Sequence, residues 1–253
     1  MRIALITGAS SGLGCELARL VDAEEKMDEI WLVARREDRL AALAQSFRTP
    51  SRALAMDLTG SDWLEELKDV LAREKPEISL LINNAGIGKT GDFTGLGEAH
   101  VQELLDLNVM ALTQNTYACL PYMKEGGRII NIASVAAFLP QPNFSIYAAS
   151  KSYVLSFSRA LHRELKGRGI SVTAVCPNPM MTEFFDKSGG IGPTGLKKMG
   201  LDKVGKVAQK ALRRSRRGKD ISITHPTAHA VRLMSKILPH SWILSLEKLV
   251  GFY

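Results

Sequence analysis

Short apolar runs alternate with longer stretches of helical period along most of this chain, and the alternation limits the folds that it can adopt. Six nearly continuous runs rich in Ile, Leu and Val lie at residues 3–7, 30–34, 53–56, 78–83, 128–133 and 170–175. Such runs are typical of strands buried on both faces of a parallel sheet. Apolar residues spaced three and four apart, as in crossover helices, lie between them at 38–47, 63–73 and 101–119. The pattern predicts an α/β fold built on a doubly wound parallel sheet.

The regular alternation ends after residue 175. Three prolines and six glycines within residues 177–205 predict a long irregular connection, of which 178–202 are expected to form a substrate lid. A helix at about 203–213, a short strand at 221–224 and an apolar, basic tail at 225–253 follow. Because no Pro/Gly/Ser-rich linker divides the chain, residues 1–253 are predicted to form a single domain.

Composition excludes several classes of protein. With 45% hydrophobic and 23% charged residues, the chain is neither disordered nor fibrous. Three widely spaced cysteines suggest neither a disulfide framework nor a zinc cluster and favour a reducing compartment. No stretch approaches the roughly 18 uninterrupted apolar residues of a membrane-spanning helix, and the start lacks the features of a signal peptide. We therefore expect a soluble, cytoplasmic protein.

Positive charge is concentrated in the last quarter of the chain. Residues 187–253 hold 14 Lys and Arg against 3 Asp and Glu, within a net charge of +7 for the whole chain. The cluster RRSRRGK at 213–219 has no recognised nucleic-acid module beside it, so we expect no nucleic acid partner. The histidines are scattered, and Pro226 is expected to separate His225 from His229, so no metal site is predicted.

The tail combines this charge with apolar residues. They recur near three- and four-residue spacing at Leu238, Trp242, Ile243, Leu246, Leu249 and Val250. The spacing predicts an amphipathic helix, and a basic one with a Trp is suited to an anionic membrane surface. Packing of its apolar face over the substrate cleft or against another subunit is the alternative that we prefer.

A glycine-rich turn, TGASSGLG at residues 7–14, directly follows the first predicted strand, and a helix is expected to begin near Ser11. Glycines let the backbone turn sharply, and free N–H groups at a helix start attract an anionic pyrophosphate. The strand–turn–helix context predicts a Rossmann-like dinucleotide site. The residues expected to contact the dinucleotide here are Gly8, Ser10, Ser11, Gly12, Leu13 and Gly14.

The end of the second predicted strand indicates which dinucleotide binds. Folds of this type that prefer NAD place an acidic residue there, which binds the ribose 2′-hydroxyl, whereas this chain has Arg35 and Arg36. Two guanidinium groups suit a 2′-phosphate, which a carboxylate would repel. We therefore predict NADP(H) as the cofactor, with Arg35 preferred over Arg36 as its contact.

Polar residues that can carry chemistry follow several strands at one edge of the predicted sheet. Tyr147 and Lys151 are four residues apart on a predicted helix and so share a face. An adjacent ammonium group lowers the pKa of a phenol, which is about 10 when free. Ser134 follows the fifth strand, and Asn83 and Asn84 end the fourth. Because the carboxyl ends of parallel strands face the ligand crevice, these groups predict a proton-transfer site beside the glycine-rich turn.

In number and order, these motifs resemble those of the short-chain dehydrogenase/reductase family over about residues 2–182. The matching segments are TGASSGLG at 7–14, Asp57, NNAG at 83–86, Asn108 within LNVMAL, Ser134, and Tyr147 with Lys151. The resemblance implies an oxidoreductase that uses a nicotinamide cofactor, and members of the family are usually dimers or tetramers.

The resemblance also implies a role for each matching position. Tyr147 would be the general acid for carbonyl reduction and the base for alcohol oxidation. Lys151 would hold the nicotinamide ribose and lower the pKa of Tyr147. Ser134 would hydrogen-bond the substrate oxygen, and Asn108 would position Lys151 and a proton-relay water. The other implied cofactor contacts are Asp57, Leu58, Asn83, Asn84, Ala85, Gly86, Pro177 and Thr182.

The chain departs from the family pattern after the sixth strand, where Pro-Gly usually precedes the Thr. The sequence here is Pro177, Asn178, Pro179, Met180, Met181 and Thr182. Asn tolerates a positive φ better than most residues and can replace the glycine, while the second proline stiffens the entry to the lid.

Three interpretations of the function stay open. We favour an NADP(H)-dependent enzyme that interconverts a small-molecule ketone or aldehyde and its alcohol. A 3-oxoacyl-thioester reductase shares the motifs, and the long lid and basic C-terminal region suit an acidic acyl carrier protein. The third interpretation is a non-enzymatic NADPH-binding regulatory protein. The complete set of catalytic residues argues against it. A hydroxysteroid-type substrate would fit apolar residues that can lie either near the cleft or in the core, which are Phe138, Leu139, Phe144, Met180, Met181, Phe184 and Phe185.

Overall fold

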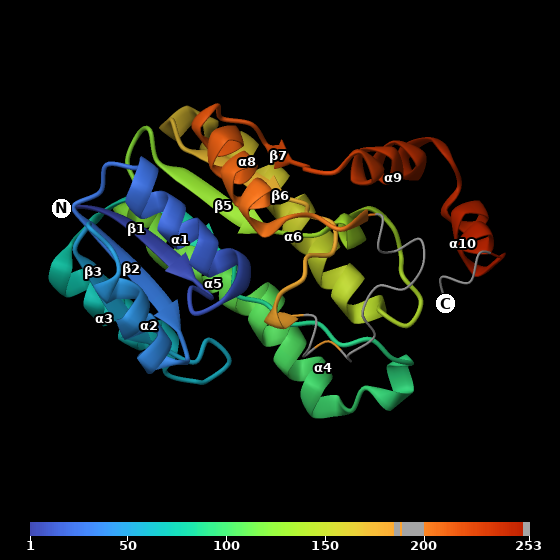
Figure 1. The fold of residues 1–253 in the computed structure, drawn as a ribbon, viewed down its shortest axis with the longest axis horizontal. Coiled ribbons are helices and arrows are strands. Elements are labelled where there is room, and N and C mark those ends of the chain that lie inside the picture. Colours follow the sequence, from blue (N-terminus) through green and yellow to red (C-terminus); the bar gives the residue numbers. More distant parts are fainter. Residues whose placement is uncertain (185–187, 189–199, 250–253) are drawn as a thin grey trace.

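A seven-stranded parallel sheet of order β3-β2-β1-β4-β5-β6-β7 forms the centre of the molecule (Figure 1). The computed structural model describes residues 1–184, 188 and 200–249. The strands are β1 (Arg2–Thr7), β2 (Glu29–Ala34), β3 (Ser51–Ala55), β4 (Glu77–Asn83), β5 (Arg128–Ile132), β6 (Ser171–Val175) and β7 (Ile221–Ser222). The doubly wound α/β fold predicted from the alternation is therefore confirmed.

Helices cover both faces of this sheet. Their bounds are α1 (Gly12–Glu24), α2 (Glu37–Gln45), α3 (Trp63–Glu74), α4 (Glu98–Leu105), α5 (Leu112–Cys119), α6 (Ser145–Glu164), α8 (Val204–Arg216), α9 (Pro226–Ile237) and α10 (His240–Leu249). Apolar side chains of α1, α2 and α8 pack on one face, and those of α3, α5 and α6 on the other. Successive strand residues such as Ile3 and Ala4 are thus both buried, on opposite faces. This explains the continuous apolar runs of the sequence.

Two predicted helices differ from the structure. Residues 101–119 were expected to form one helix, but a π-helical turn (Asp106–Ala111) joins α4 to α5. The predicted tail helix is divided between α9 and α10 at Pro239, because the residue before a proline disfavours helical backbone. Leu238 therefore ends α9 with extended backbone and does not share a helix with Trp242. The side chains of Leu246, Leu249 and Val250 lie outside the described residues.

Pro226 begins the helix that it was expected to interrupt. It occupies the first turn of α9, where the missing N–H of proline breaks no helical hydrogen bond. His225 caps this helix by accepting a hydrogen bond from the backbone N–H of Thr227. Within the described ranges, no three His, Cys, Asp or Glu residues are grouped so as to hold a metal ion, and no helix is long and apolar enough to cross a membrane.

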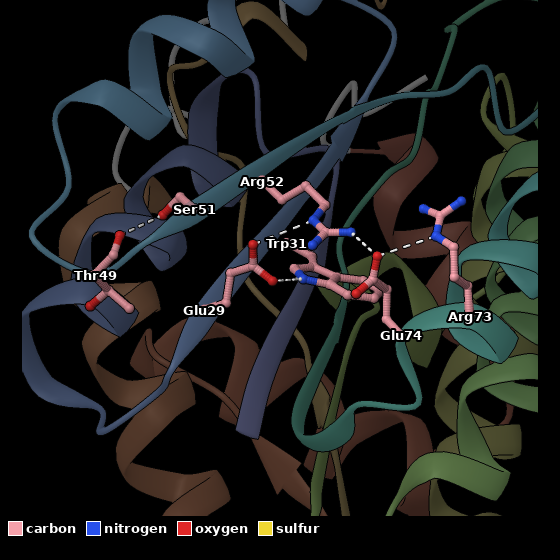
Figure 2. A network of polar contacts seen from close by, with 7 residues as sticks. All are labelled: Glu29, Trp31, Thr49, Ser51, Arg52, Arg73 and Glu74. Atoms are coloured by element: carbon pink, nitrogen blue, oxygen red, sulfur yellow. Dashed lines mark hydrogen bonds and ion pairs between the residues drawn. The ribbon is translucent and has the colours of Figure 1, made fainter. Parts of the chain in front are cut away.

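A polar network holds the edge strand β3 against the sheet (Figure 2). The indole Nε1 of Trp31, which is fully buried on β2, donates to Glu29 Oε2 at 2.6 Å. Arg52 on β3 lies over the Trp31 ring at 5.1 Å from its centroid and donates to Glu29 at 3.3 Å and to Glu74 at 3.0 Å. Arg73 donates to the same Glu74. The network therefore connects β2, β3 and the end of α3.

Replacement of Arg52 by Met keeps part of the apolar stem but removes the guanidinium that covers Trp31 and pairs with two carboxylates. We expect the free energy of unfolding to fall by about 1–2 kcal/mol, measured by urea unfolding. Lys68→Met is the matched control, because it breaks an exposed pair with Glu65, and it should cost less than about 0.5 kcal/mol. Equal losses in the two variants would contradict a special role for Arg52.

Candidate active site

A cavity of about 1400 Å³ runs along the carboxyl ends of the strands. It exceeds the roughly 300–1,000 Å³ of a pocket for one drug-sized ligand, so it has room for a dinucleotide and a second molecule. The predicted site residues that line it are Gly8, Ser10, Ser11, Gly12, Leu13, Arg35, Arg36, Asp57, Leu58, Asn84, Ala85, Gly86, Ser134, Tyr147, Lys151, Pro177 and Thr182. Gly14 and Asn108 are not among the lining residues; both support the wall from outside the cavity.

At Gly8 and Gly14 the glycine-rich turn is packed too tightly for a side chain. Gly8 has a φ of 67°, in the left-handed region that favours glycine. A Cβ on Gly14 would lie 2.2 Å from the Gly8 carbonyl oxygen and 2.4 Å from Asn84 Nδ2. Asn84 Nδ2 donates to the carbonyl oxygens of Thr7 at 3.1 Å and Gly8 at 3.2 Å. The turn is thereby fixed against the end of β4.

The start of α1 faces the cavity next to this turn. Its N-cap, Ser11, makes no side-chain capping hydrogen bond, so the first N–H groups of the helix have no partner from this side chain. Gly12 has a φ of 54°, and a Cβ there would lie 3.4 Å from the side chain of Thr182. Thr182 therefore lies close to a helix start that is suited to an anion.

The two arginines after β2 occupy different positions. Arg36 donates from Nε and Nη2 to Ser10 Oγ at 3.3 and 3.0 Å, and from Nη2 to Ser11 Oγ at 2.9 Å. Arg35 Nη1 lies 3.8 Å from Asp57 Oδ2, and its side chain is half exposed. Both arginines line the cavity. Arg36 is bound to the glycine-rich turn, a contact that the sequence did not reveal when Arg35 was preferred.

Tyr147 and Lys151 lie on α6 with Lys151 Nζ at 5.7 Å from the centroid of the Tyr147 ring. Both side chains are buried, and Lys151 Nζ donates to the carbonyl oxygen of Ile132 at 2.9 Å. Phe144 stacks on Tyr147 with the ring centroids 4.2 Å apart, and the Phe184 ring lies at 5.6 Å. The phenol is therefore enclosed by aromatic rings at the cavity wall.

This enclosure changes the acidity of both groups. Burial raises the pKa of Tyr147 to about 12, against which a hydrogen bond from Ser134 acts. Burial lowers the pKa of Lys151 to about 8. We expected Lys151 to lower the pKa of Tyr147; in the structure, loss of hydration at the phenol outweighs the hydrogen bond from Ser134, and the pKa rises. At neutral pH Tyr147 keeps its proton and most of the Lys151 amine is charged.

Asn108 lies in the π-helical turn between α4 and α5, a deformation common at functional sites. Its Oδ1 accepts from the N–H of Ile87, and its Nδ2 donates to the Ile87 carbonyl, both at 2.9 Å. Nδ2 also donates to Ser150 Oγ at 3.1 Å. A Cβ on Gly86 would lie 3.0 Å from Asn108 Oδ1 and 3.3 Å from Lys151 Nζ. The structure therefore brings Asn108 and Lys151 close to the same side of Gly86.

Asn83 does not line the cavity, contrary to the prediction. Its Nδ2 donates to Thr116 Oγ1 at 2.9 Å and to Asn131 Oδ1 at 2.8 Å, and its Oδ1 accepts from Asn115 at 2.7 Å. Successive residues at a strand end point in opposite directions, so Asn84 faces the turn while Asn83 points between β4 and α5.

Asn178 does not adopt the positive φ that would make it a substitute for glycine. It is held by hydrogen bonds instead. Its backbone N–H donates to Asp202 at 2.8 Å, and its Nδ2 donates to Gly200 O and Thr227 Oγ1, both at 2.7 Å. These contacts join the start of the predicted lid to α9. Residues 185–187 and 189–199 of that lid, including Phe185, lie outside the described residues.

Several residues of the cavity were not among the predicted catalytic or cofactor-binding residues. The tail contributes an apolar wall, whose members are Val231, Met234, Leu238, Trp242 and Ile243. Gly88 is required by close packing, because a Cβ there would lie 2.8 Å from Phe184 and 2.9 Å from Tyr147. Only the apolar spacing of the tail signalled any of this in the sequence. The preferred interpretation of the tail was packing over the cleft or against another subunit, and this wall agrees with the first of the two.

Comparisons with known proteins identify similar chains. A family model described as short chain dehydrogenase matches residues 2–189. Serine 3-dehydrogenase of Agrobacterium fabrum is 34% identical over 185 residues, which cover 71% of this chain and 72% of that protein.

Two solved structures extend the likeness over nearly the whole chain. A short-chain dehydrogenase from Sphingobium yanoikuyae in complex with NADPH superposes with a TM-score of 0.81 at 33% identity, covering 97% of this chain and 96% of that one. A bulky-bulky ketone specific alcohol dehydrogenase from Comamonas testosteroni gives a TM-score of 0.75 at 28% identity, covering 94% and 95%.

Gly14→Ala tests the packing of the glycine-rich turn. The new methyl group would meet the Gly8 carbonyl, which is backbone and cannot move aside without shifting the turn. We expect Tm to fall by roughly 3–10 °C in a thermal unfolding measurement. Gly95→Ala is the control, since nothing lies within 4 Å of a Cβ there. If both variants unfold at the same temperature, the close contact does not constrain the turn.

Proposed function

This chain belongs to the short chain dehydrogenase family, and we propose that it is an NADP(H)-dependent enzyme that interconverts a ketone or aldehyde and its alcohol. One observation carries the proposal: the Tyr147 phenol, Ser134 and Lys151 line the same cavity as the glycine-rich turn. The residues fit a dinucleotide, because the α1 start and two arginines offer donors to phosphates. The close packing at Gly12 and Gly86 supports this fit.

Proton transfer is assigned to Tyr147. During carbonyl reduction the phenol gives its proton to the carbonyl oxygen, to which the Ser134 hydroxyl donates a hydrogen bond. During alcohol oxidation the phenolate takes the proton back. The raised pKa of Tyr147 suits the first direction, because the phenol is protonated at neutral pH. A bound nicotinamide dinucleotide would supply or accept the hydride.

Lys151 and Asn108 are assigned to support Tyr147. The Lys151 ammonium would hold the ribose of the dinucleotide and stabilise the phenolate by its charge. Its hydrogen bond to Ile132 fixes Nζ at the end of β5. Asn108 holds the segment around Gly86 and Ile87, which Lys151 also contacts, so it would position Lys151 through packing.

The substrate end of the cavity is assigned to the predicted lid at 178–202 and the tail. The charged residues among the described lining are Arg35, Arg36, Asp57, Lys151 and Glu183. All five belong to the half that we assign to the dinucleotide, whereas α9 and α10 contribute apolar side chains to the other half. An uncharged substrate with a bulky apolar part fits this wall best.

The basic cluster at 213–219 gives little support to a 3-oxoacyl-thioester reductase. Arg216 donates to Glu24 at 2.8 Å and to Glu25 at 3.0 Å, at the end of α1. The 13 residues of α1 span about 20 Å from the glycine-rich turn to that end. The cluster therefore lies at the opposite edge of the sheet from the cavity, where it does not meet an acyl carrier at the cavity mouth.

Contact with a second subunit or a membrane is assigned to exposed apolar residues. On the tail, Leu233 is 59% and Ile237 69% exposed, and neither lines the cavity. In Figure 1, α9 and α10 lie at the end of the molecule opposite the amino terminus. Their inner side lines the cavity, which supports a cover of the cleft, and their outer side would serve a homo-dimer or tetramer, or an anionic membrane.

Tyr147→Phe tests the mechanism. A spectrophotometric screen of NADPH consumption against ketosteroids, acyl thioesters, sugars and small aldehydes first identifies a substrate. With that substrate, we expect kcat to fall at least about 100-fold while NADPH binding is unchanged, because only the proton donor is lost. Tyr153→Phe on the same helix, outside the cavity lining, should change kcat less than about twofold. Full turnover by Tyr147→Phe would refute the role, and NADPH binding without turnover of any compound would favour the regulatory protein.

Arg35→Asp tests the cofactor preference. The new carboxylate would repel a 2′-phosphate, so we expect the KM for NADPH to rise at least about tenfold relative to that for NADH. Arg35→Met separates lost attraction from added repulsion and should show a smaller rise. An unchanged ratio of the two KM values in Arg35→Asp would reject the assignment of Arg35.

A further inference from the structure

An ionic cluster at the dinucleotide end of the cavity joins Glu183, in the segment after β6, to the start of α2. Glu183 accepts a hydrogen bond from Arg36 Nη1 at 2.8 Å and another from Arg39 Nη1. The hydrogen bonds from Arg39 and Arg36 hold the pKa of Glu183 down at about 2, so the carboxylate is charged at neutral pH. Glu183 and Arg36 both line the cavity.

Each of the three side-chain nitrogens of Arg36 donates within this cluster. Its Nε and Nη2 bind the hydroxyls of Ser10 and Ser11, and its Nη1 binds Glu183. Ser10 and Arg36 are among the predicted dinucleotide contacts, and Arg36 follows the second strand, whose end faces the ribose 2′ position in folds of this type. The Glu183 carboxylate therefore already binds the arginine, Arg36, that a phosphate of the ligand would bind.

We propose that Glu183 competes with the 2′-phosphate of NADP(H) for Arg36 and Arg39 and so lowers the preference of the site for NADP(H) over NAD(H). The inference rests on the proposed binding of a dinucleotide at this turn. A phosphate monoester carries nearly two negative charges and must displace Glu183 or bind beside it against repulsion. NAD(H) lacks that phosphate and leaves the Glu183 contacts intact.

Glu183→Gln tests the competition in the full-length protein, since Gln has nearly the same shape without the charge. The dissociation constants of NADP⁺ and NAD⁺ are measured by calorimetry for the parent and the variant. We expect NADP⁺ to bind about five- to tenfold more tightly and NAD⁺ to change less than about twofold. The gain should shrink at high salt, because the side chains are partly exposed.

Three further measurements separate the charge of Glu183 from other effects. Glu37→Gln removes the same charge beside Arg36 from a side chain that makes no hydrogen bond or ion pair with another described residue, so it should leave the NADP⁺/NAD⁺ ratio unchanged. In an Arg36→Met background, Glu183→Gln should change the NADP⁺/NAD⁺ ratio less, because one of the two arginines for which Glu183 and the phosphate compete has been removed. The dissociation constant of the fragment 2′,5′-ADP should change in Glu183→Gln as that of NADP⁺ does, since the fragment carries the 2′-phosphate without the nicotinamide.

The outcomes distinguish the inference from the function on which it rests. An unchanged NADP⁺/NAD⁺ ratio in Glu183→Gln, with both dinucleotides bound, overturns the competition alone. Equal weakening of both also overturns it, because Glu183 would then hold the dinucleotide in place. Failure of the parent to bind either dinucleotide overturns the proposed function and the inference with it. Glu183→Ala should give the same NADP⁺/NAD⁺ ratio as Glu183→Gln if the charge of Glu183 sets the preference between the two dinucleotides.

Discussion

The close contact between the glycine-rich turn after β1 and the end of β4 is the constraint on which the rest of the structure depends. Asn84 holds the carbonyls of Thr7 and Gly8, and Gly14 approaches Gly8 so closely that only hydrogen fits. This contact needs β1 and β4 to be parallel neighbours that end at the same edge. The start of α1 then faces the cavity, and its first N–H groups, which have no partner within the helix, become the natural place for an anion.

Burial around this edge determines the chemistry of the candidate catalytic residues. The Tyr147 phenol keeps its proton because Phe144 and Phe184 exclude water from it, and Lys151 is drawn to the Ile132 carbonyl by the same shortage of water. A positive charge from a bound ligand would oppose the raised pKa of the phenol. Proton transfer in this protein is therefore expected to depend on what occupies the cavity as well as on the pair itself.

The cavity has two chemically different ends, and segments far apart in the chain build each of them. Arg36 and Glu183 meet across 147 residues at the charged end. At the other end, the tail helices add Met234 and Trp242 to an apolar wall. The charged end already holds the Glu183 carboxylate. The affinity for a phosphorylated ligand therefore depends on competition between this carboxylate and the phosphate for the arginines. Cofactor preference then depends on a residue of the segment after β6 as much as on the arginines.

The sequence by itself determined the α/β class, the glycine-rich turn and the shared face of Tyr147 and Lys151. These features are local, because strand burial, turn conformation and helical spacing leave their pattern within a few residues. Only the tertiary structure decided that Asn83 turns away from the cavity, that Arg36 binds Ser10 and Glu183, and that the pKa of Tyr147 rises. Those properties arise from groups brought together by the packing of the whole sheet, and no local pattern records which distant side chains will meet.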